Sequence, residues 1–257
     1  MRIAERQRAI VQLVNEKGSV PFSDIQECFP DVSGMTLRRD LEALDKRNEL
    51  IRIHGGAKSI NCVMYPEDDY NTRIVNNVEQ KQRIARTAVA MLRPEMTVYI
   101  DSGTTAVEFS KAFPDDDYLI YTHGLHCGLE LSKLEKPEIH LVGGKLSRIS
   151  LSIVGSNAVY CLDNINFDMV FLSAGAYSSS RGFTCRGEEE SYLRKAVIQR
   201  AEKVVMLMDS SKVGKMSSYT LATLDDIDVL ITDRGIDDQT LEEFRAHGIE
   251  VRFCTEW

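Results

Sequence analysis

Apolar residues recur every three or four positions through the first part of the chain, a spacing that predicts short amphipathic helices. A first helix ends before Gly18, and its buried stripe consists of Ile3, Ile10, Leu13 and Val14. A second helix is capped by Ser23 or Asp24, and its inward side consists of Ile25, Cys28 and Phe29. After a tight turn, Ser33 caps a third helix, whose buried stripe consists of Leu37, Leu41 and Leu44. We therefore expect a small three-helix domain.

The third predicted helix presents a polar outer face at its N-terminal end. With Leu37 turned to the core and about 100° per residue, Met35 and Arg39 point outward. Thr36 and Arg38 lie on the flanks. This is the arrangement of a recognition helix, whose N-terminal residues reach base edges and phosphates in a DNA major groove. Because charged helix faces are also common solvated surfaces, periodicity alone leaves both interpretations open.

A short stretch after the third helix, LIRIHGGA, alternates apolar and polar residues and then turns at Gly55-Gly56. It predicts a β-hairpin wing with Arg52 and His54 on its outer side. Such side chains contact the DNA backbone or the minor groove beside a recognition helix. The predicted DNA-binding residues are Ser33, Met35, Thr36, Arg38, Arg39, Arg52 and His54.

A change of pattern separates this region from the rest of the chain. Residues 59–73 lose periodicity and gather Asn, Pro and acidic residues, which is typical of a linker. Over residues 74–257, helical stretches, the first from Asn76 to Arg93, alternate with seven apolar runs: TVYI, YLIYT, IHLVG, MVFLSAG, KVVMLMD, DVLITD and EVRF. This rhythm predicts an α/β domain with a largely parallel sheet and helices on both faces. We expect one domain over residues 1–58 and a second over residues 74–257.

Small hydroxyl residues follow the first of these runs. In open α/β sheets, ligands bind beyond the carboxyl ends of the strands. The loop Asp101-Ser102-Gly103-Thr104-Thr105 joins a predicted strand to a predicted helix, where backbone N–H groups favour a phosphate. The same residue types also make ordinary turns. Further loops at 143–145, 173–176 and 209–212 would complete a pocket for a small anionic ligand.

Charge changes the picture only when it is counted by domain. The 257 residues carry a net charge of -8, but residues 1–58 hold 10 Lys and Arg against 9 Asp and Glu, so the acidity belongs to the second domain. Charges occupy the N-terminus where a secretory signal needs an apolar core, and no apolar run has the length of a membrane span. The six cysteines form no C-x-x-C pair. We expect a cytoplasmic protein with reduced thiols and no membrane partner.

The N-terminal domain carries three motifs that together resemble the DNA-binding domain of DeoR-type regulators: Arg6-x3-Ile10-x3-Val14, Ser33-x2-Thr36-Leu37-Arg38-Arg39-Asp40-Leu41 and Leu50-x-Arg52-x-His54-Gly55-Gly56-Ala57. The resemblance fills this domain and implies a winged helix-turn-helix. One departure is a segment from Val14 to Ser33 that is one residue longer than is usual in the family, with the extra residue at Pro30-Asp31. Such an insertion changes how the recognition helix is aimed.

The second domain, over about residues 74 to 253, resembles the sensor domain of the DeoR family, which shares its fold with ribose-5-phosphate isomerase and glucosamine-6-phosphate deaminase. The matching motifs are Asp101 to Thr105, Gly143-Gly144, Gly182-Phe183-Thr184, Glu189-Glu190 and Asp209-Ser210-Ser211-Lys212-x-Gly214. The resemblance implies that this domain senses a sugar phosphate, that loop 101–105 holds the phosphate and that Lys212 supplies a cation. The effector-binding residues it implies are Asp101, Ser102, Gly103, Thr104, Thr105, Gly175, Arg194 and Lys212.

Three departures fall where ligand specificity is expected. Arg194 stands where the family has a lysine, and its planar fork still grips a phosphate. Ser173 and Ala176 stand in a segment that is Gly-Ala-Thr-Gly in the family and narrow the pocket, and His123 replaces the usual asparagine. The identity of the sugar is therefore not carried over.

Two functions of different classes fit this pocket. The resemblance implies a repressor of a carbohydrate-metabolism operon, with a double-stranded DNA operator and a phosphorylated sugar as partners. The alternative is a sugar-phosphate isomerase or deaminase with an appended helical domain, for which residues 188–190, Asp101 and His123 are candidate acids and bases. The complete DNA-binding signature favours the repressor, so we expect no enzymatic activity. Residues 188–190 are then the acidic first turn of a helix.

Two further expectations concern metals and assembly. His123-x2-His126-Cys127 places three possible ligands within about one helical turn, but a cluster without a distant fourth ligand is typical of packing. We expect no metal and no cofactor. Because one winged helix covers only a short DNA site, we expect a homo-oligomer, a dimer or larger, held together by the second domain.

Overall fold

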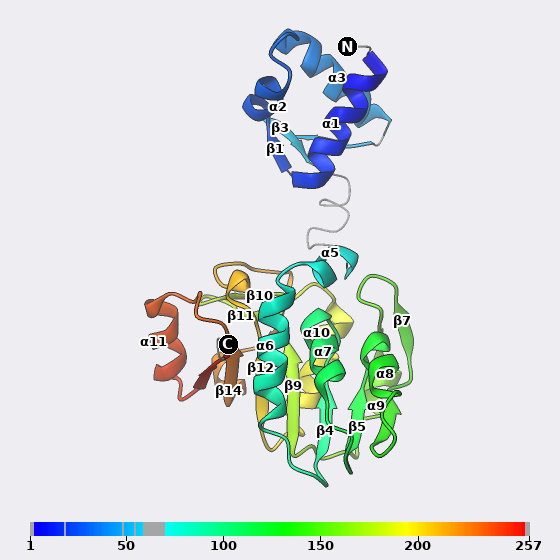
Figure 1. Cartoon of the computed structure of the whole chain (residues 1–257), viewed down its shortest axis with the longest axis vertical. Coiled ribbons are helices and arrows are strands. Elements are labelled where there is room, and N and C mark those ends of the chain that lie inside the picture. Colours follow the sequence, from blue (N-terminus) through cyan, green and yellow to red (C-terminus); the bar gives the residue numbers. More distant parts are fainter. Residues whose placement is uncertain (1–2, 18, 48, 54, 59–69, 255–257) are drawn as a thin grey trace. The chain divides into compact units, whose positions relative to one another are not determined.

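The computed structural model describes residues 3–17, 19–47, 49–53, 55–58 and 70–254. The chain forms two compact units, Met1–Asp69 and Tyr70–Trp257 (Figure 1). The first unit has one buried cluster of apolar side chains, and the second has two, one on each face of its large sheet.

Three helices and a small sheet form the N-terminal unit. The helices are α1 (Ile3–Lys17), α2 (Phe22–Cys28) and α3 (Gly34–Lys46), and the strands are β1 (Ser19–Pro21), β2 (Ile51–Ile53) and β3 (Gly56–Lys58). β3 pairs antiparallel with both β1 and β2, so β2 and β3 form the predicted wing. The helical core contains the predicted residues Ile10, Val14, Ile25, Leu37, Leu41 and Leu44. The winged helix-turn-helix is confirmed.

Details of this unit differ from the sequence predictions. Ile3 is 63% exposed because it is the first residue of α1 and lies beyond the packed cluster. Cys28 is exposed because Ile25 and Phe29, four residues apart, take the inward side of α2. α2 begins at Phe22 after Pro21, whose φ of -59° suits helix entry, so neither Ser23 nor Asp24 is its cap. Strand β1 was not predicted, because three residues are too few to show alternation.

The second unit is built on a seven-stranded sheet in the order β15-β14-β12-β9-β4-β5-β6. All neighbouring strands in it are parallel. The strands are β4 (Thr97–Ile100), β5 (Leu119–Thr122), β6 (Glu138–Leu141), β9 (Met169–Ser173), β12 (Val204–Leu207), β14 (Val229–Thr232) and β15 (Glu250–Phe253). Six of the seven predicted apolar runs contain one of these strands, and the run IHLVG overlaps β6, which begins one residue earlier at Glu138. This confirms the parallel α/β fold.

Helices and two smaller sheets surround this sheet (Figure 1). The helices are α5 (Tyr70–Val75), α6 (Val78–Val89), α7 (Thr104–Ala112), α8 (Leu125–Leu131), α9 (Ser156–Tyr160), α10 (Glu188–Ile198) and α11 (Asp238–Ala246), with short 3-10 helices η1 (Ser210–Lys212) and η2 (Leu224–Asp226). One smaller sheet has the order β10 (Ala176–Ser178), β11 (Gly182–Cys185), β13 (Tyr219–Ala222), and the other is the hairpin of β7 (Lys145–Ser147) and β8 (Ser152–Val154).

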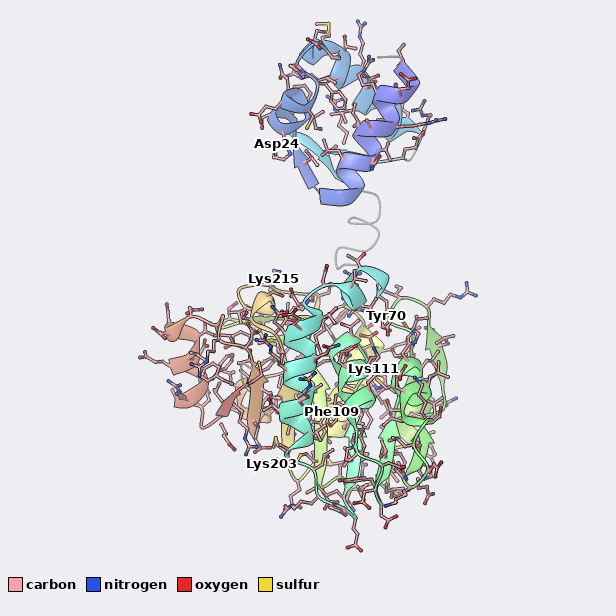
Figure 2. All side chains as sticks on the ribbon, in the orientation of Figure 1. Asp24, Tyr70, Phe109, Lys111, Lys203 and Lys215 are labelled. Atoms are coloured by element: carbon pink, nitrogen blue, oxygen red, sulfur yellow. The ribbon has the colours of Figure 1, made fainter. Side chains whose placement is uncertain are left out.

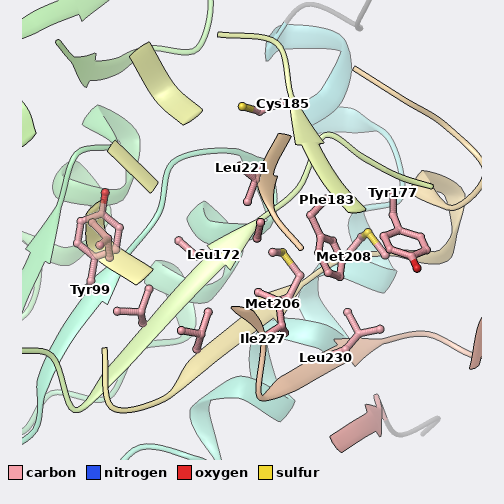
Figure 3. Packing of buried hydrophobic residues seen from close by; sticks show 14 of the residues in the cluster. Tyr99, Leu172, Tyr177, Phe183, Cys185, Met206, Met208, Leu221, Ile227 and Leu230 are labelled. Atoms are coloured by element: carbon pink, nitrogen blue, oxygen red, sulfur yellow. The ribbon is translucent and has the colours of Figure 1, made fainter. Parts of the chain in front are cut away.

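The two faces of the central sheet are covered by different helices. Val98 and Ile100 pack on the face that α6, α7 and α8 cover, whereas Tyr99 packs on the face covered by α9, α10, α11 and the small sheet. Figure 3 shows this second cluster, with Phe183 of the small sheet close to Met206 and Met208. On α7, Phe109 is buried and Lys111 is exposed (Figure 2). Burial on both faces explains why the strands are continuous apolar runs.

One predicted helix is shorter than expected. The stretch from Asn76 to Arg93 contains α6, which spans only Val78–Val89. Asn77 has a left-handed backbone (φ 52°), which separates α6 from α5. Residues 70–73, expected in the linker, belong to α5. Across the described ranges, no helix combines the length and apolar character that a membrane crossing requires.

Candidate functional sites

The side chain of Ser33 closes the N-terminal end of α3. Its Oγ accepts a hydrogen bond from the backbone N–H of Thr36 at 3.2 Å and lies 2.9 Å from the Thr36 hydroxyl. This cap satisfies one of the N–H groups that have no partner inside the helix. Met35 is 68% exposed, and Arg38 and Arg39 are exposed. The predicted residues of α3 therefore lie together at one end of one helix.

The two arginines of α3 have different surroundings. The guanidinium of Arg38 lies over the ring of Phe22 on α2, 4.9 Å from its centre, in a cation–π contact that limits its motion. Arg39 contributes to a positive field on the outer face. The hydrogen bond and charge of Lys46 lower the pKa of Glu42 below its ordinary value, and Arg52 and Arg39 add to this effect. On the outer face, Arg38 is thus held by an aromatic contact, and Arg39 adds positive charge.

The wing lies against the same helix. The backbone N–H of Arg52 on β2 donates to Asp45 Oδ1 at 3.0 Å, which ties the wing to α3, while the side chain of Arg52 is exposed. His54, the other predicted wing residue, lies outside the described residues. The Arg52 side chain is thus available on the side of α3 where the charges of Arg39 and Arg52 both act on Glu42.

A buried polar network holds α3 against α1. Arg6 Nε donates to Asp40 Oδ2 at 2.6 Å, and Gln7 Nε2 donates to Asp40 Oδ1 at 2.8 Å. Arg47 at the end of α3 donates to Gln7 Oε1 at 2.8 Å. Asp40 is only 4% exposed, so this ion pair is shielded from solvent. Sequence reasoning assigned no role to these residues, although Arg6 and Asp40 stand in the motifs of the DNA-binding domain.

The loop between β4 and α7 forms the centre of the second candidate site. Gly103 precedes α7 with a φ of 105°, which a residue with a side chain rarely adopts, and a Cβ there would lie 3.1 Å from Ser173 Oγ. No side chain caps α7. The first-turn N–H groups of α7 therefore lack a side-chain acceptor, which is the arrangement that favours an anion. Ser102, Thr104 and Thr105 beside it are almost fully buried.

Asp101, at the start of this loop, forms hydrogen bonds within the protein and is shielded from solvent. Its carboxylate is fully buried and accepts from the backbone N–H and the hydroxyl of Ser173, at 2.8 and 2.9 Å. Ser173 also donates to the carbonyl oxygen of Ser102 at 2.7 Å. These bonds join the ends of β4 and β9 and fix the course of the loop.

The guanidinium of Arg194, on α10, is buried among acceptors. Its Nε donates to Asp101 Oδ1 at 2.9 Å, Nη1 donates to Glu190 Oε2 at 3.1 Å, and Nη2 lies 3.4 Å from Ser102 Oγ. Burial opposes the charge, but the two carboxylates outweigh it and hold the pKa of Arg194 well above its ordinary value. Because all three nitrogens have partners within the chain, contact between Arg194 and an effector stays a prediction.

His123 completes this buried group. Its Nδ1 lies 2.7 Å from the hydroxyl of Tyr99, and its Nε2 lies 3.5 Å from Asp101 Oδ1. Burial lowers the pKa of His123 to about 4, against the opposing charge of Asp101, so the ring is neutral at pH 7. His126 instead stacks on Tyr70. Within the described part of the chain, no group of three His, Cys, Asp or Glu side chains is arranged to hold a metal ion.

Lys212 lies at the end of η1, after β12. Asp209 caps η1 by accepting from the backbone N–H of Ser211 at 3.1 Å. The amide of Asn77 donates to Asp209 Oδ1 and lies within hydrogen-bond distance of Ser211 Oγ, both at 3.1 Å. These bonds tie the segment that carries Lys212 to the start of α6.

Lys81 on α6 is a buried cation that the sequence predictions missed. Its Nζ donates to the carbonyl oxygens of Arg73 and Asn76, and the residue is 4% exposed. The pKa of Lys81 is lowered to about 8, chiefly by burial, with Asp209 raising it and Lys212 lowering it. The sequence could have indicated that Lys81 is buried, because its helical spacing places it on the same side of α6 as Ile84, Ala85 and Ala88.

Residues in the other predicted effector loops form hydrogen bonds and ion pairs within this unit. The backbone N–H of Gly175, a predicted effector residue, donates to the Thr184 carbonyl at 3.1 Å. Glu189, a candidate acid or base, pairs with Lys145 at 2.9 Å, and both Glu189 and Glu190 lie in the first turn of α10. The acidic residues thus occupy the positive end of a helix dipole.

Comparisons with known proteins match both units. Residues 6–63 match the family model of the DeoR-like helix-turn-helix domain, and residues 76–234 match that of the DeoR C terminal sensor domain. The HTH-type transcriptional regulator GlpR of Haloferax volcanii is 34% identical over 249 residues, which cover 96% of each chain. The lactose phosphotransferase system repressor of Streptococcus mutans is 30% identical over 241 residues, 93% of this chain and 95% of the relative.

Among solved structures, ribose 5-phosphate isomerase A of Methanocaldococcus jannaschii aligns with 54% of this chain and 55% of its own. The sequence identity is 18% and the TM-score is 0.40.

Proposed function

The chain belongs to the DeoR family of transcriptional regulators, and on this premise we propose that it is a repressor of a carbohydrate-metabolism operon, with an operator affinity set by a phosphorylated sugar. The observation that carries the proposal is the presence, in one chain, of an exposed arginine-bearing helix end and of a helix end without a side-chain cap. The first suits DNA, and the second suits a small anion.

In the proposed DNA complex, the N-terminal end of α3 enters the major groove. Arg38 and Arg39 contact guanine or phosphate, and Met35 offers an apolar contact to a thymine methyl group. Ser33 and Thr36 lie where hydroxyls approach the phosphate backbone. Arg52, with His54, contacts the flanking backbone or the minor groove.

In the proposed effector complex, the phosphate lies at the N-terminal end of α7. The backbone N–H groups of Gly103, Thr104 and Thr105 donate to it, and the hydroxyl of Ser102 lies beside them. Lys212 and Lys81 supply positive charge, since the charge of Lys212 and that of Glu108 on α7 both act on Lys81. Gly175 lies in the neighbouring loop after β9, and the ion pair of Asp101 and Arg194 holds the loop between β4 and α7 in position.

We further propose that the protein has no enzymatic activity and works in the cytoplasm. The rival function requires a carboxylate that exchanges protons with substrate. Asp101 and Glu190 are instead held in ion pairs with the buried Arg194. Burial opposes the charge of Glu190, but Arg194 outweighs it and lowers the pKa of Glu190 below its ordinary value, so this carboxylate is a poor proton acceptor.

Thermal unfolding with a panel of sugar phosphates tests the proposal. A ligand at 100 times its Kd stabilises the native state by about 2.7 kcal/mol, so the cognate compound stands out as a raised Tm. The same sugars without phosphate serve as the control and should give no shift. The proposal fails if no sugar phosphate shifts the Tm, or if the unphosphorylated sugar shifts it equally. Turnover of the stabilising compound would favour the enzyme instead.

A further inference from the structure

Exposed apolar side chains gather around one edge of the central sheet. Large hydrophobic residues on the surface of a monomer are ordinary when scattered, but a contiguous group marks an interaction site. This group, which we call the β6 edge, consists of Leu129, Leu141, Leu146, Ile149 and Tyr160, each between 46% and 77% exposed. They come from α8, β6, the β7–β8 hairpin and α9.

The elements of the β6 edge lie against one another. A Cβ built on Gly128 of α8 would lie 3.4 Å from Leu141 Cδ1, so α8 packs on β6. Gly143, after β6, is close to Cys161, the residue after Tyr160, with the Cys161 thiol 4.0 Å from the Gly143 carbonyl. Figure 1 shows α8, α9 and β7 on the same side of this unit. Because α8 and α9 cover opposite faces of the sheet, the apolar group wraps around its edge.

The backbone at this edge is open to a partner. The backbone N–H of Glu138 donates to the carbonyl of Tyr118, just before β5, and that of Val142 donates to Thr122 at the end of β5. The alternation of a parallel strand therefore turns the N–H groups of Ile139 and Leu141 outward. β6 is the last strand of the sheet on this side. At the other edge, the described residues of β15 and α11 include no exposed large hydrophobic side chain. The β6 edge therefore carries exposed apolar side chains that the described residues of the opposite edge lack.

The polar side chains on β6 are self-complementary. Glu138 and His140 lie on the same side of the strand, 2.8 Å apart between Oε1 and Nε2. A two-fold axis through Ile139 would set Glu138 of one copy opposite His140 of the other, which is the symmetry of an isologous dimer. A second copy also meets the need of the N-terminal unit, whose single recognition helix reads one half-site.

The β7–β8 hairpin connects this edge to the candidate effector site. The backbone N–H of Ile153 donates to the carbonyl of His123 at 2.7 Å, and that of Leu125 donates to Leu151 at 3.1 Å. Lys145 pairs with Glu189, next to the Glu190 that holds Arg194. Leu146 and Ile149 therefore stand on a segment that contacts both the loop after β5 and the start of α10.

We infer that a second copy of this chain docks on the β6 edge, with the β7–β8 hairpin lying between the interface and the effector loops. The dimer surface stands on the geometry of the edge alone, whereas its coupling to ligand rests on the proposed function. Movement of the loops that surround an effector then changes the surface that the two copies share.

Sedimentation of the full chain over a range of micromolar concentrations tests this inference. The wild-type chain should be at least a dimer. Leu141→Glu, and independently Leu129→Glu, should weaken the dimer by about 30-fold or more, the loss expected for a central interface side chain. Met216→Glu is the matched control, because Met216 is 65% exposed on the same unit outside the β6 edge. All three positions are exposed, and thermal unfolding verifies that each variant is folded.

A monomeric wild-type chain, edge variants that associate like the wild type, or a control that dissociates as strongly as they do would overturn the inference. The Tm shift with the sugar-phosphate panel, measured on the same proteins, separates the two proposals. Unchanged mass with a retained shift contradicts only the dimer surface, whereas a missing shift with dissociation of the edge variants contradicts only the proposed function.

Discussion

The N-terminal ends of α3 and α7 differ in whether a side chain caps the backbone N–H groups of the first turn. The Ser33 side chain caps α3, and the exposed residues beyond it, Met35, Arg38 and Arg39, project long side chains. No side chain caps α7, and the residues around Gly103 are small and buried. A long flexible side chain suits the broad surface of a DNA groove, whereas bare N–H groups suit one small anion.

Behind each helix end lies a buried arginine–aspartate pair. Arg6 and Asp40 hold α3 to α1, and Arg194 and Asp101 hold the α7 loop to α10. The first pair is supported by Gln7, whereas Arg194 carries a second carboxylate, Glu190. In both units an ion pair therefore holds the helix in position, and loss of Arg194 leaves more buried charge uncompensated than loss of Arg6.

The largest expected effect is that of Arg194→Met. It leaves both Asp101 and Glu190 buried without a countercharge, which should cost roughly 5 kcal/mol of unfolding free energy, the upper end for broken buried pairs. Denaturant unfolding of the C-terminal unit measures it. Arg200→Met is the control, because the Arg200–Asp163 pair is partly exposed and should be worth less than about 1 kcal/mol. Equal losses in the two variants would contradict the role of Arg194.

Asp40→Ala should have the next largest effect, confined to the N-terminal unit. Arg6 would remain buried without its carboxylate, at a cost of roughly 3 kcal/mol. DNA binding should be lost while the Tm shift with sugar phosphate persists. Glu42→Ala, which removes only the exposed pair with Lys46, should leave stability nearly unchanged. Loss of ligand response in Asp40→Ala would argue against separate supports for the two sites.

Arg39→Ala and Arg38→Ala should weaken operator binding by about 1 to 3 kcal/mol each without unfolding the unit. An arginine that reads a base loses specificity at one position, and one that holds phosphate weakens all sequences together. Fluorescence anisotropy with operator variants separates these cases. Arg8→Ala, exposed on α1, is the control. Unchanged affinity in the double variant Arg38→Ala, Arg39→Ala would remove α3 from the interface.

The smallest effect concerns Lys81, a buried cation without a carboxylate partner in direct contact among the described side chains. Since its pKa falls from 10.5 to about 8 on folding, the folded chain binds fewer protons than the unfolded chain between these values. Stability should therefore rise with pH through this window. Lys81→Met should remove that rise and should destabilise the protein at pH 7 less than Arg194→Met, because it leaves two carbonyls without a donor but no unpaired charge. Equal pH profiles for both proteins would contradict the lowered pKa.

The sequence predicts those parts of the fold that follow from local periodicity. The seven strands are evident because residues such as Val98 and Phe171 are buried on a sheet covered on both faces. The sheet of β10, β11 and β13 is not evident, because its short strands come from separate segments whose pairing depends on tertiary contacts.

The candidate sites follow the same rule. Ser33, Arg38 and Arg39 could be placed from the position of Leu37 alone, since all four lie within two turns of one helix. The pairing of Asp101 with Arg194 could not, because 93 residues separate them. The sequence identified both residues near one loop through a family resemblance, but only the fold reveals that each is the other's partner.

We propose that an anion bound in the C-terminal unit controls DNA binding by the N-terminal unit. The direct test is an anisotropy titration of an operator duplex, selected from a random pool, with and without the sugar phosphate that raises the Tm. We predict that saturating ligand changes the operator Kd by about 5- to 150-fold. We also predict that Lys212→Ala, with the same affinity for bare operator, requires a higher ligand concentration for the half-maximal change. An operator Kd that stays the same at saturating ligand would contradict this coupling.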